Sequence, residues 1–200
     1  MKAGLAILLG TAATAVVAQD RVAAAGNGPA APNKAGEDAL RRADATLRQM
    51  TPDERTVLTH GIMPLPVGVS PPPIPADAIP GAGYVGGIAR LGVPALKETD
   101  ASLGVAYVFG LRRDGATALP SALAMASTWN PLLIEQGGAM IGAEARAKGF
   151  NVMLGGGVNL MRDPRNGRNF EYFGEDPLLS GTLAGHAIRG IQSNHIIATI

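Results

Sequence analysis

The sequence contains no cysteine, which excludes disulfide bonds, thiolate metal sites and a cysteine nucleophile. Charge of either sign is scarce, because only 16% of the 200 residues are charged and 17 Lys+Arg face 16 Asp+Glu. If an N-terminal leader containing Lys2 were removed, the numbers of basic and acidic residues would be equal. This neutrality gives no electrostatic reason to expect nucleic acid or an anionic membrane as a partner. Hydrophobic residues make up 46%, enough for one domain with a real core.

Long apolar runs are also missing, apart from one at the N-terminus. Lys2 is followed by an apolar run of about 15 residues, which is short for a membrane span of about 20. Small residues then precede Gln19, a pattern typical of a cleavage site. The sequence therefore predicts a signal peptide at 1–18, an exported protein in the periplasm or outside the cell, and no stable membrane insertion after cleavage. An uncleaved anchor is the alternative. Residues 19–35 are small, polar and aperiodic, and predict a flexible linker.

Two helices are expected next. The first is predicted by the helical spacing of Leu40, Ala43, Leu47 and Met50. Thr51, Pro52 and Glu54 have the pattern of a capping box with proline in the first turn, and the second helix is expected to stop at Gly61. The prolines of 62–82 exclude a central strand there and predict a long ordered loop.

Strands and helices then alternate. Apolar stretches predict strands at 93–99, 150–154 and 195–200. A short helix is expected at 120–128. Capping patterns predict a longer one from Asn130 to about Lys148, with an inner face at Leu133, Gly137, Met140, Ile141 and Ala145, and another from Asp176. Apolar strands interleaved with capped helices predict an α/β protein with a parallel sheet, either doubly wound or a (β/α)8 barrel.

The most polar segment is RDPRNGRNFEYFGEDP, residues 162–177, with three arginines, four acids and three aromatic residues. It follows the strand region at 150–160, and Asp100 follows the strand at 93–99. In both candidate folds, functional loops follow the carboxyl ends of strands. Asp100 and Arg168 are therefore expected to converge on one face of the sheet.

Other polar residues have simpler interpretations. Asp176 is expected to cap a helix, with Glu175 at the same positive helix end, and Glu171 to order the loop around Arg168. Glu144 is expected to pair with a basic neighbour. Trp129 could stack on a sugar ring, but its position before a capped helix is more typical of a packing residue.

No metal site or cofactor is expected. The histidines at 60, 186 and 195 lack metal-ligand spacing. The three glycines at 155–157 are not followed by the helix that a phosphate-binding loop requires, so nucleotide binding is not predicted.

The segment GGGVNLMRDPRNGRNFEYFGEDPLLSGTLAGHAIRGIQ resembles the N-terminal barrel of glycoside hydrolase family 3. The match runs through Gly167, Arg168, Asn169, Glu171, Phe173, Glu175, Asp176 and Pro177. MTPDERTVLTHG and IGAEARAKGFNVMLGGGVNL are also similar to family segments, so the resemblance covers roughly residues 36–200. It implies that 36–200 form the N-terminal portion of a (β/α)8 barrel.

The resemblance implies two substrate-binding residues. Asp100 occupies the place of the family's aspartate that holds the terminal sugar, and Arg168 that of an arginine lining the same pocket. A carboxylate accepts hydrogen bonds from neighbouring hydroxyls, and a guanidinium donates them. Alternatively, Asp100 forms an Asx turn, and Arg168 bridges to Glu171 or Glu175. The family often has an arginine six positions after this aspartate, but Ala106 stands there, so a second donor is missing or supplied elsewhere.

The implied activity is exo-acting hydrolysis of terminal β-linked glucose or xylose by a retaining two-carboxylate mechanism, with a small saccharide as the binding partner. In the family the nucleophile lies later in the barrel and the acid in a following domain. The chain is therefore expected to be an N-terminal fragment that is inactive alone, with no catalytic residue of its own. The alternatives are an exported, catalytically inactive carbohydrate-binding protein and a complete small α/β protein with a structural role.

Overall fold

The computed structural model describes residues 34–66, 73–106, 108–155 and 157–199. The chain divides into two units, Met1–Arg42 and Ala43–Ile200. Helix α1 (Lys34–Gln49) contains the boundary between them, and the other elements below belong to the second unit. The expected leader at 1–18 and most of the expected linker at 19–35 lie outside the described residues, while Lys34 and Ala35 belong to a helix. Within the described part of the chain, no helix combines the length and the apolar character needed to cross a bilayer.

The main sheet has five strands in the order β1-β2-β3-β4-β7. Its central and last strands are parallel, because β3 pairs with β4 and β4 with β7 in the same direction. The first two strands are antiparallel to their neighbours, which corrects the expectation of a purely parallel sheet. The strands are β1 (Gly61–Ile62), β2 (Gly83–Val85), β3 (Leu96–Asp100), β4 (Val152–Leu154) and β7 (Ile197–Thr199). Among its described residues, the proline-rich region contributes the end of β1, which lies at the sheet edge.

The described part of the chain begins with two helices, α1 (Lys34–Gln49) and α2 (Pro52–Val57). Thr51 and Glu54 form the expected capping box at the start of α2. The helix ends at Val57 rather than at Gly61, because Gly61 already pairs with Val85 in the sheet. The first expected helix is confirmed as α1, which has no buried residue. Of the four residues whose spacing predicted it, Met50, which follows the helix, is buried.

Three further helices follow: α3 (Ala122–Ala126), α4 (Pro131–Ala147) and α5 (Pro177–Gln192). Side chains from α4, α5 and β4 form one core cluster, with Phe150, Met153 and Ala145 almost fully buried. The expected inner face of α4 is confirmed at Ile141 and Ala145. It is wrong at Leu133, which is exposed while its neighbour Ile134 is buried. The true stripe is thus shifted by one residue in the first turn of the helix.

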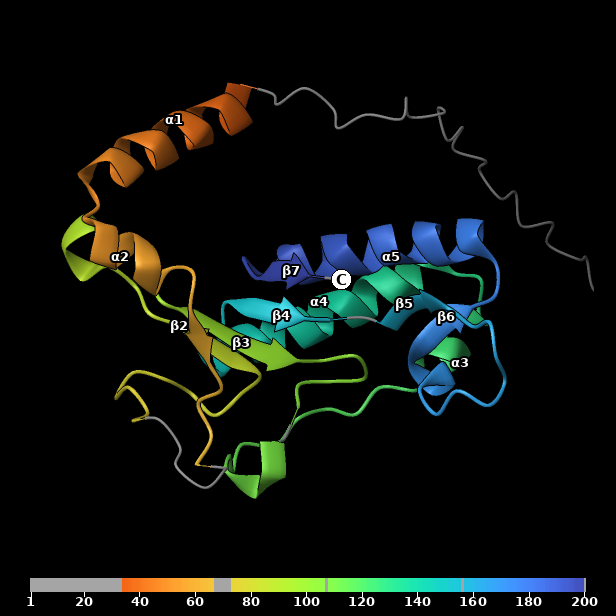
Figure 1. The fold of residues 1–200 in the computed structure, drawn as a ribbon. Helices are drawn as coiled ribbons and strands as arrows, with labels where there is room; N and C mark the ends of the chain where they lie inside the picture. Colours follow the sequence, from red (N-terminus) through yellow and green to blue (C-terminus); the bar gives the residue numbers. More distant parts are fainter. Residues whose placement is uncertain (1–33, 67–72, 107, 156, 200) are drawn as a thin grey trace, which may run out of the picture. The chain divides into compact units, whose positions relative to one another are not determined.

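Helices α4 and α5 lie side by side (Figure 1), and glycines at their interface let the two backbones approach closely. A Cβ atom on Gly138 would lie 2.5 Å from the carbonyl oxygen of Ala187, and one on Gly142 would lie 2.8 Å from that of Ile191. Neither oxygen can move without displacing a helix. These glycines therefore set the distance between α4 and α5, which both pack against the sheet.

The first prediction concerns this helix contact. Gly138→Ala should lower the free energy of unfolding by about 1–3 kcal/mol, because the new methyl group forces the helices apart. The adjacent Gly137→Ala is the matched control, since its Cβ would lie at an ordinary 3.6 Å from Leu119 Cδ1. It should raise stability by about 0.5–1 kcal/mol through helix propensity. Urea unfolding of both variants measures the difference, and equal stabilities would contradict the close approach.

Candidate functional site

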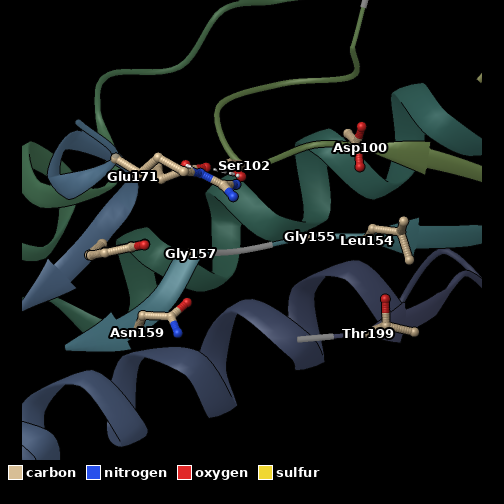
Figure 2. A pocket seen from close by; sticks show the side chains of 10 residues that line it. Asp100, Ser102, Leu154, Gly155, Gly157, Asn159, Glu171 and Thr199 are labelled. Atoms are coloured by element: carbon tan, nitrogen blue, oxygen red, sulfur yellow. Dashed lines mark hydrogen bonds and ion pairs between the residues drawn. The ribbon is translucent and has the colours of Figure 1, made fainter. Parts of the chain in front are cut away.

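The candidate site lies at the carboxyl edge of the parallel strands. Asp100, Leu154 and Thr199 are the last residues of β3, β4 and β7. The strand register places Asp100 opposite Leu154 and Leu154 opposite Thr199. Figure 2 shows these three side chains at the ends of their neighbouring strands. In parallel α/β folds this edge is where ligand-binding loops gather.

A second, two-stranded sheet completes the site. Strand β5 (Gly157–Leu160) pairs in parallel with β6 (Tyr172–Gly174). The chain between them carries most of the polar segment and ends in a short 3-10 helix, η3 (Asn169–Glu171). A side chain at Gly157 would collide with the carbonyl oxygen of Glu171. Glycine at this position therefore lets η3 lie directly against β5.

The carboxyl edge of the main sheet, the loop that follows β3 and the chain from β5 to β6 line an open pocket of about 600 Å³. Its lining is mostly polar and comes from five strands and their loops. The lining residues are Asp100, Ser102, Leu154, Gly155, Gly157, Asn159, Arg168, Glu171, Tyr172 and Thr199. This volume lies within the range of sites that bind small molecules.

Asp100 and Arg168 line this same pocket, so their predicted convergence is confirmed. Arg168 is 72% exposed and its Nε donates a hydrogen bond to Glu171 Oε1. That bond, and after it the negative charge of Glu171, raises the pKa of Arg168 above its usual value. Among the described residues, the Asp100 carboxylate accepts no hydrogen bond, so the alternative of an Asx turn is not realised. A sugar-binding role for the pair stays a prediction.

Glu171 is the buried acid of the pocket, with only 7% of its side chain exposed. One oxygen accepts from Arg168, and the other accepts from Ser102 Oγ at 2.9 Å. The Arg168 hydrogen bond lowers the pKa of Glu171 below its usual 4.5; burial opposes this, and the Ser102 bond adds to it. Both interpretations of Arg168 thus hold at once, since it lines the pocket and pairs with Glu171. The expected role of Glu171 in ordering the loop is confirmed.

The expectations for the other polar residues have mixed outcomes. Asp176 caps α5, accepting from the Leu179 backbone N–H at 2.8 Å, as predicted. Glu144 was expected to pair with a basic neighbour. It instead accepts from the backbone N–H and the hydroxyl of Thr117. Trp129 is 72% exposed with a left-handed φ of 54°, so its expected packing role is wrong.

Several lining residues were missed by sequence reasoning, namely Ser102, Asn159, Tyr172 and Thr199. Ser102 and Thr199 carried a usable signal, because they stand at or just after the ends of predicted strands. Asn159 did not, since residues 150–160 read as one strand. Tyr172 lies within the polar segment 162–177, but no pattern there distinguished it from its neighbours. The structure breaks this stretch into β4 and β5, which belong to different sheets.

A buried arginine, Arg112, holds the loop after β3 against the core. Arg112 is 7% exposed, donates to Asp114 through Nε at 2.9 Å and Nη2 at 2.7 Å, and lies 4.8 Å above the Phe150 ring. The paired bond to Arg112, helped by Lys148, lowers the pKa of Asp114 to about 2. Arg112 also donates to the backbone oxygen of Ala106 at 3.4 Å. Asp100 therefore begins a loop that is anchored to the core.

No group of three or more histidine, aspartate or glutamate side chains in the described residues is arranged to hold a metal ion. The polar groups of the pocket are instead one free carboxylate, one guanidinium, an amide and hydroxyls. Such a mixture of acceptors and donors suits a neutral, hydroxyl-rich ligand.

Comparison with known proteins identifies the family. Residues 85–200 match the model of the glycosyl hydrolase family 3 N terminal domain. The chain belongs to glycosyl hydrolase family 3. Its α/β fold is accordingly the N-terminal portion of a (β/α)8 barrel, as predicted.

Relatives within the family are much longer than this chain. It is 32% identical over 157 residues to a probable beta-glucosidase I of Neosartorya fischeri, covering 78% of this chain and 17% of the relative. It is 43% identical over 122 residues to a beta-glucosidase of Bacteroides ovatus, covering 57% and 16%. The chain thus spans less than a fifth of the length of these curated relatives.

Solved family structures share the fold. Beta-glucosidase 3B from Thermotoga neapolitana, in complex with glucose, is 33% identical with a TM-score of 0.69, covering 78% of this chain and 22% of that one. DesR, a beta-glucosidase from Streptomyces venezuelae in complex with D-glucose, is 33% identical with a TM-score of 0.66, covering 78% and 18%.

The second prediction concerns pH and follows from the lowered pKa of Glu171. A carboxyl group whose pKa is lower in the folded state contributes stability above its unfolded pKa, and loses it as the pH falls through the folded pKa. Wild type should therefore be more stable than Glu171→Gln at pH 7, and this difference should shrink below about pH 4.5. Urea unfolding of both proteins between pH 3 and 7 measures it. A difference that stays constant over this range would contradict the assigned pairing.

Proposed function

We propose that this chain is the sugar-holding part of an exo-acting glycoside hydrolase that removes terminal β-linked glucose or xylose. The observation that carries the proposal is the meeting of Asp100 and Arg168 in one polar pocket at the carboxyl edge of the sheet. Membership of the family and the names of its beta-glucosidase relatives support the substrate class. The apolar N-terminal segment supports export as a further part of the proposal.

The pocket chemistry fits one sugar unit. The Asp100 carboxylate is exposed and can accept hydrogen bonds from two neighbouring hydroxyls. Arg168 uses its Nε for Glu171, which leaves its two Nη groups to donate to a third position. Every sugar hydroxyl can both donate and accept, so it can pair with either group. Because the acceptor and the donor have fixed positions in the pocket, together they favour one orientation of a neutral ring.

The bond-breaking chemistry is proposed to come from elsewhere. A retaining glycosidase needs a carboxylate nucleophile and a second carboxyl group about 5 Å away that gives up and recovers a proton. Glu171 suits neither role, because both of its oxygens are engaged and its pKa is lowered. Asp100 is assigned to the sugar hydroxyls. The 200 residues alone therefore bind sugar without cleaving it.

The third prediction tests this division. Residues 1–200, incubated with 4-nitrophenyl β-glucoside and β-xyloside, should release no nitrophenol above background, whereas the protein produced from its complete gene should release it readily. Turnover by residues 1–200 would contradict the assignment. A complete protein that binds glucose in calorimetry but cleaves neither glycoside would instead be an inactive carbohydrate-binding protein.

The fourth prediction tests Asp100 itself. In the protein from the complete gene, Asp100→Asn should lower kcat/KM by about 10- to 150-fold. This range corresponds to the loss of one hydrogen bond to a charged group, which contributes about 1.5–3 kcal/mol. Asp163→Asn is the matched control, because Asp163 lies in the loop after β5, pairs with Arg165 and does not line the pocket. It should leave kcat/KM within about twofold. Equal effects of the two substitutions would remove Asp100 from the site.

A further inference from the structure

We infer that Glu171 is a positioning residue, which aims Arg168 at the sugar and fastens the Arg168 loop to the Asp100 loop. This inference rests on the proposed function, and it assigns a role to a residue that need not touch the sugar. It follows from the burial of Glu171, from its two hydrogen-bond partners and from where those partners lie in the chain.

The first argument is that Glu171 gives Arg168 its fixed point. The Arg168 side chain is mostly exposed, and within the described residues its only side-chain hydrogen bond goes from Nε to Glu171. A long exposed side chain without such an anchor samples many rotamers, and ordering it on binding weakens affinity. A bond at Nε restricts the plane of the guanidinium while leaving both Nη groups available. The bond to Glu171 therefore orders Arg168 before the sugar binds, so that less side-chain entropy is lost on binding.

The second argument is that Glu171 joins two loops. Ser102, the donor to its second oxygen, is two residues from Asp100 and 69 residues from Glu171 in the chain. Arg168, the donor to its first oxygen, is three residues away within the same turn. One buried carboxylate thus links the loop after β3 to the loop after β5. Figure 2 shows Glu171 and Ser102 beside each other, with Asp100 at the end of its strand.

The third argument is that Glu171 is itself held rigidly. Its backbone N–H donates to the Arg168 carbonyl oxygen at 3.1 Å within η3. Its own carbonyl oxygen sits against Gly157, where no side chain would fit, and Tyr172 then pairs with Gly157 in the sheet. A carboxylate on such a fixed backbone can define the position of a mobile arginine. Arg168 is not suited to position Glu171 in turn, because its own side chain is exposed and lies on a loop.

The experiment is a double-mutant cycle in the protein produced from its complete gene. Glu171→Gln keeps the shape of the side chain but removes the charge that holds Arg168. It should raise both KM for 4-nitrophenyl β-glucoside and the inhibition constant for glucose about tenfold, with kcat changed less than about threefold. In an Arg168→Met background, the same Glu171→Gln change should alter either constant by less than about twofold, because the residue it acts through is gone.

Two further variants complete the design. Glu171→Asp keeps the charge and should restore part of the lost affinity. Glu175→Gln is the matched control, since this nearby acid is exposed and does not line the pocket; it should leave both constants unchanged. If Glu171→Gln does not fold, as judged by its melting curve, Ser102→Ala replaces it and should raise both constants in the same direction at unchanged kcat.

The outcomes separate the inference from the proposed function. Full additivity of Glu171→Gln and Arg168→Met in an active enzyme would overturn the positioning role and leave the hydrolase proposal standing. An unchanged KM in the folded Glu171→Gln protein, or in Ser102→Ala where it is the substitute, would do the same. A wild-type protein that neither cleaves these glycosides nor binds glucose would overturn the proposed function, and the inference with it.

Discussion

The parallel register of β3, β4 and β7 is the constraint on which the site depends. It brings Asp100, Leu154 and Thr199, which are far apart in the chain, into one row at the carboxyl edge. The backbone hydrogen bonds of the sheet fix this row to within one residue, because a slip of one position would turn each side chain to the opposite face. The pocket floor is thus set by the main chain, and only the loops above it depend on side-chain interactions.

Helix packing protects that register. Glycines between α4 and α5 let the two helices pack closely, and both helices contribute to the core beside β4. At the other end of the β3 loop, the buried Arg112 is neutralised by Asp114 and stacks on Phe150. A buried guanidinium is stable only when its charge is paired. The loop that starts at Asp100 is therefore tied to the same core as the strand that precedes it.

Much of this arrangement could be predicted from the sequence, and the limits have physical causes. Caps at Thr51, Asn130 and Asp176 were predictable because a side-chain oxygen and a following proline or capping-box acid are local signals. The meeting of Asp100 and Arg168 was predictable because parallel strands align their ends. The break between β4 and β5 was not, since one apolar run can serve two sheets. The exposure of Trp129 and the Thr117 partner of Glu144 depend on tertiary contacts that no local pattern encodes.

The two bonds to Glu171 differ greatly in the length of chain that they close. The contact with Arg168 spans three residues and the contact with Ser102 spans 69. Closing a short segment costs little chain entropy, whereas the longer closure becomes favourable only after β3 and β5 have found their places. We therefore expect the arginine turn to form earlier in folding than the Ser102 hydroxyl bond, which should be among the last contacts made.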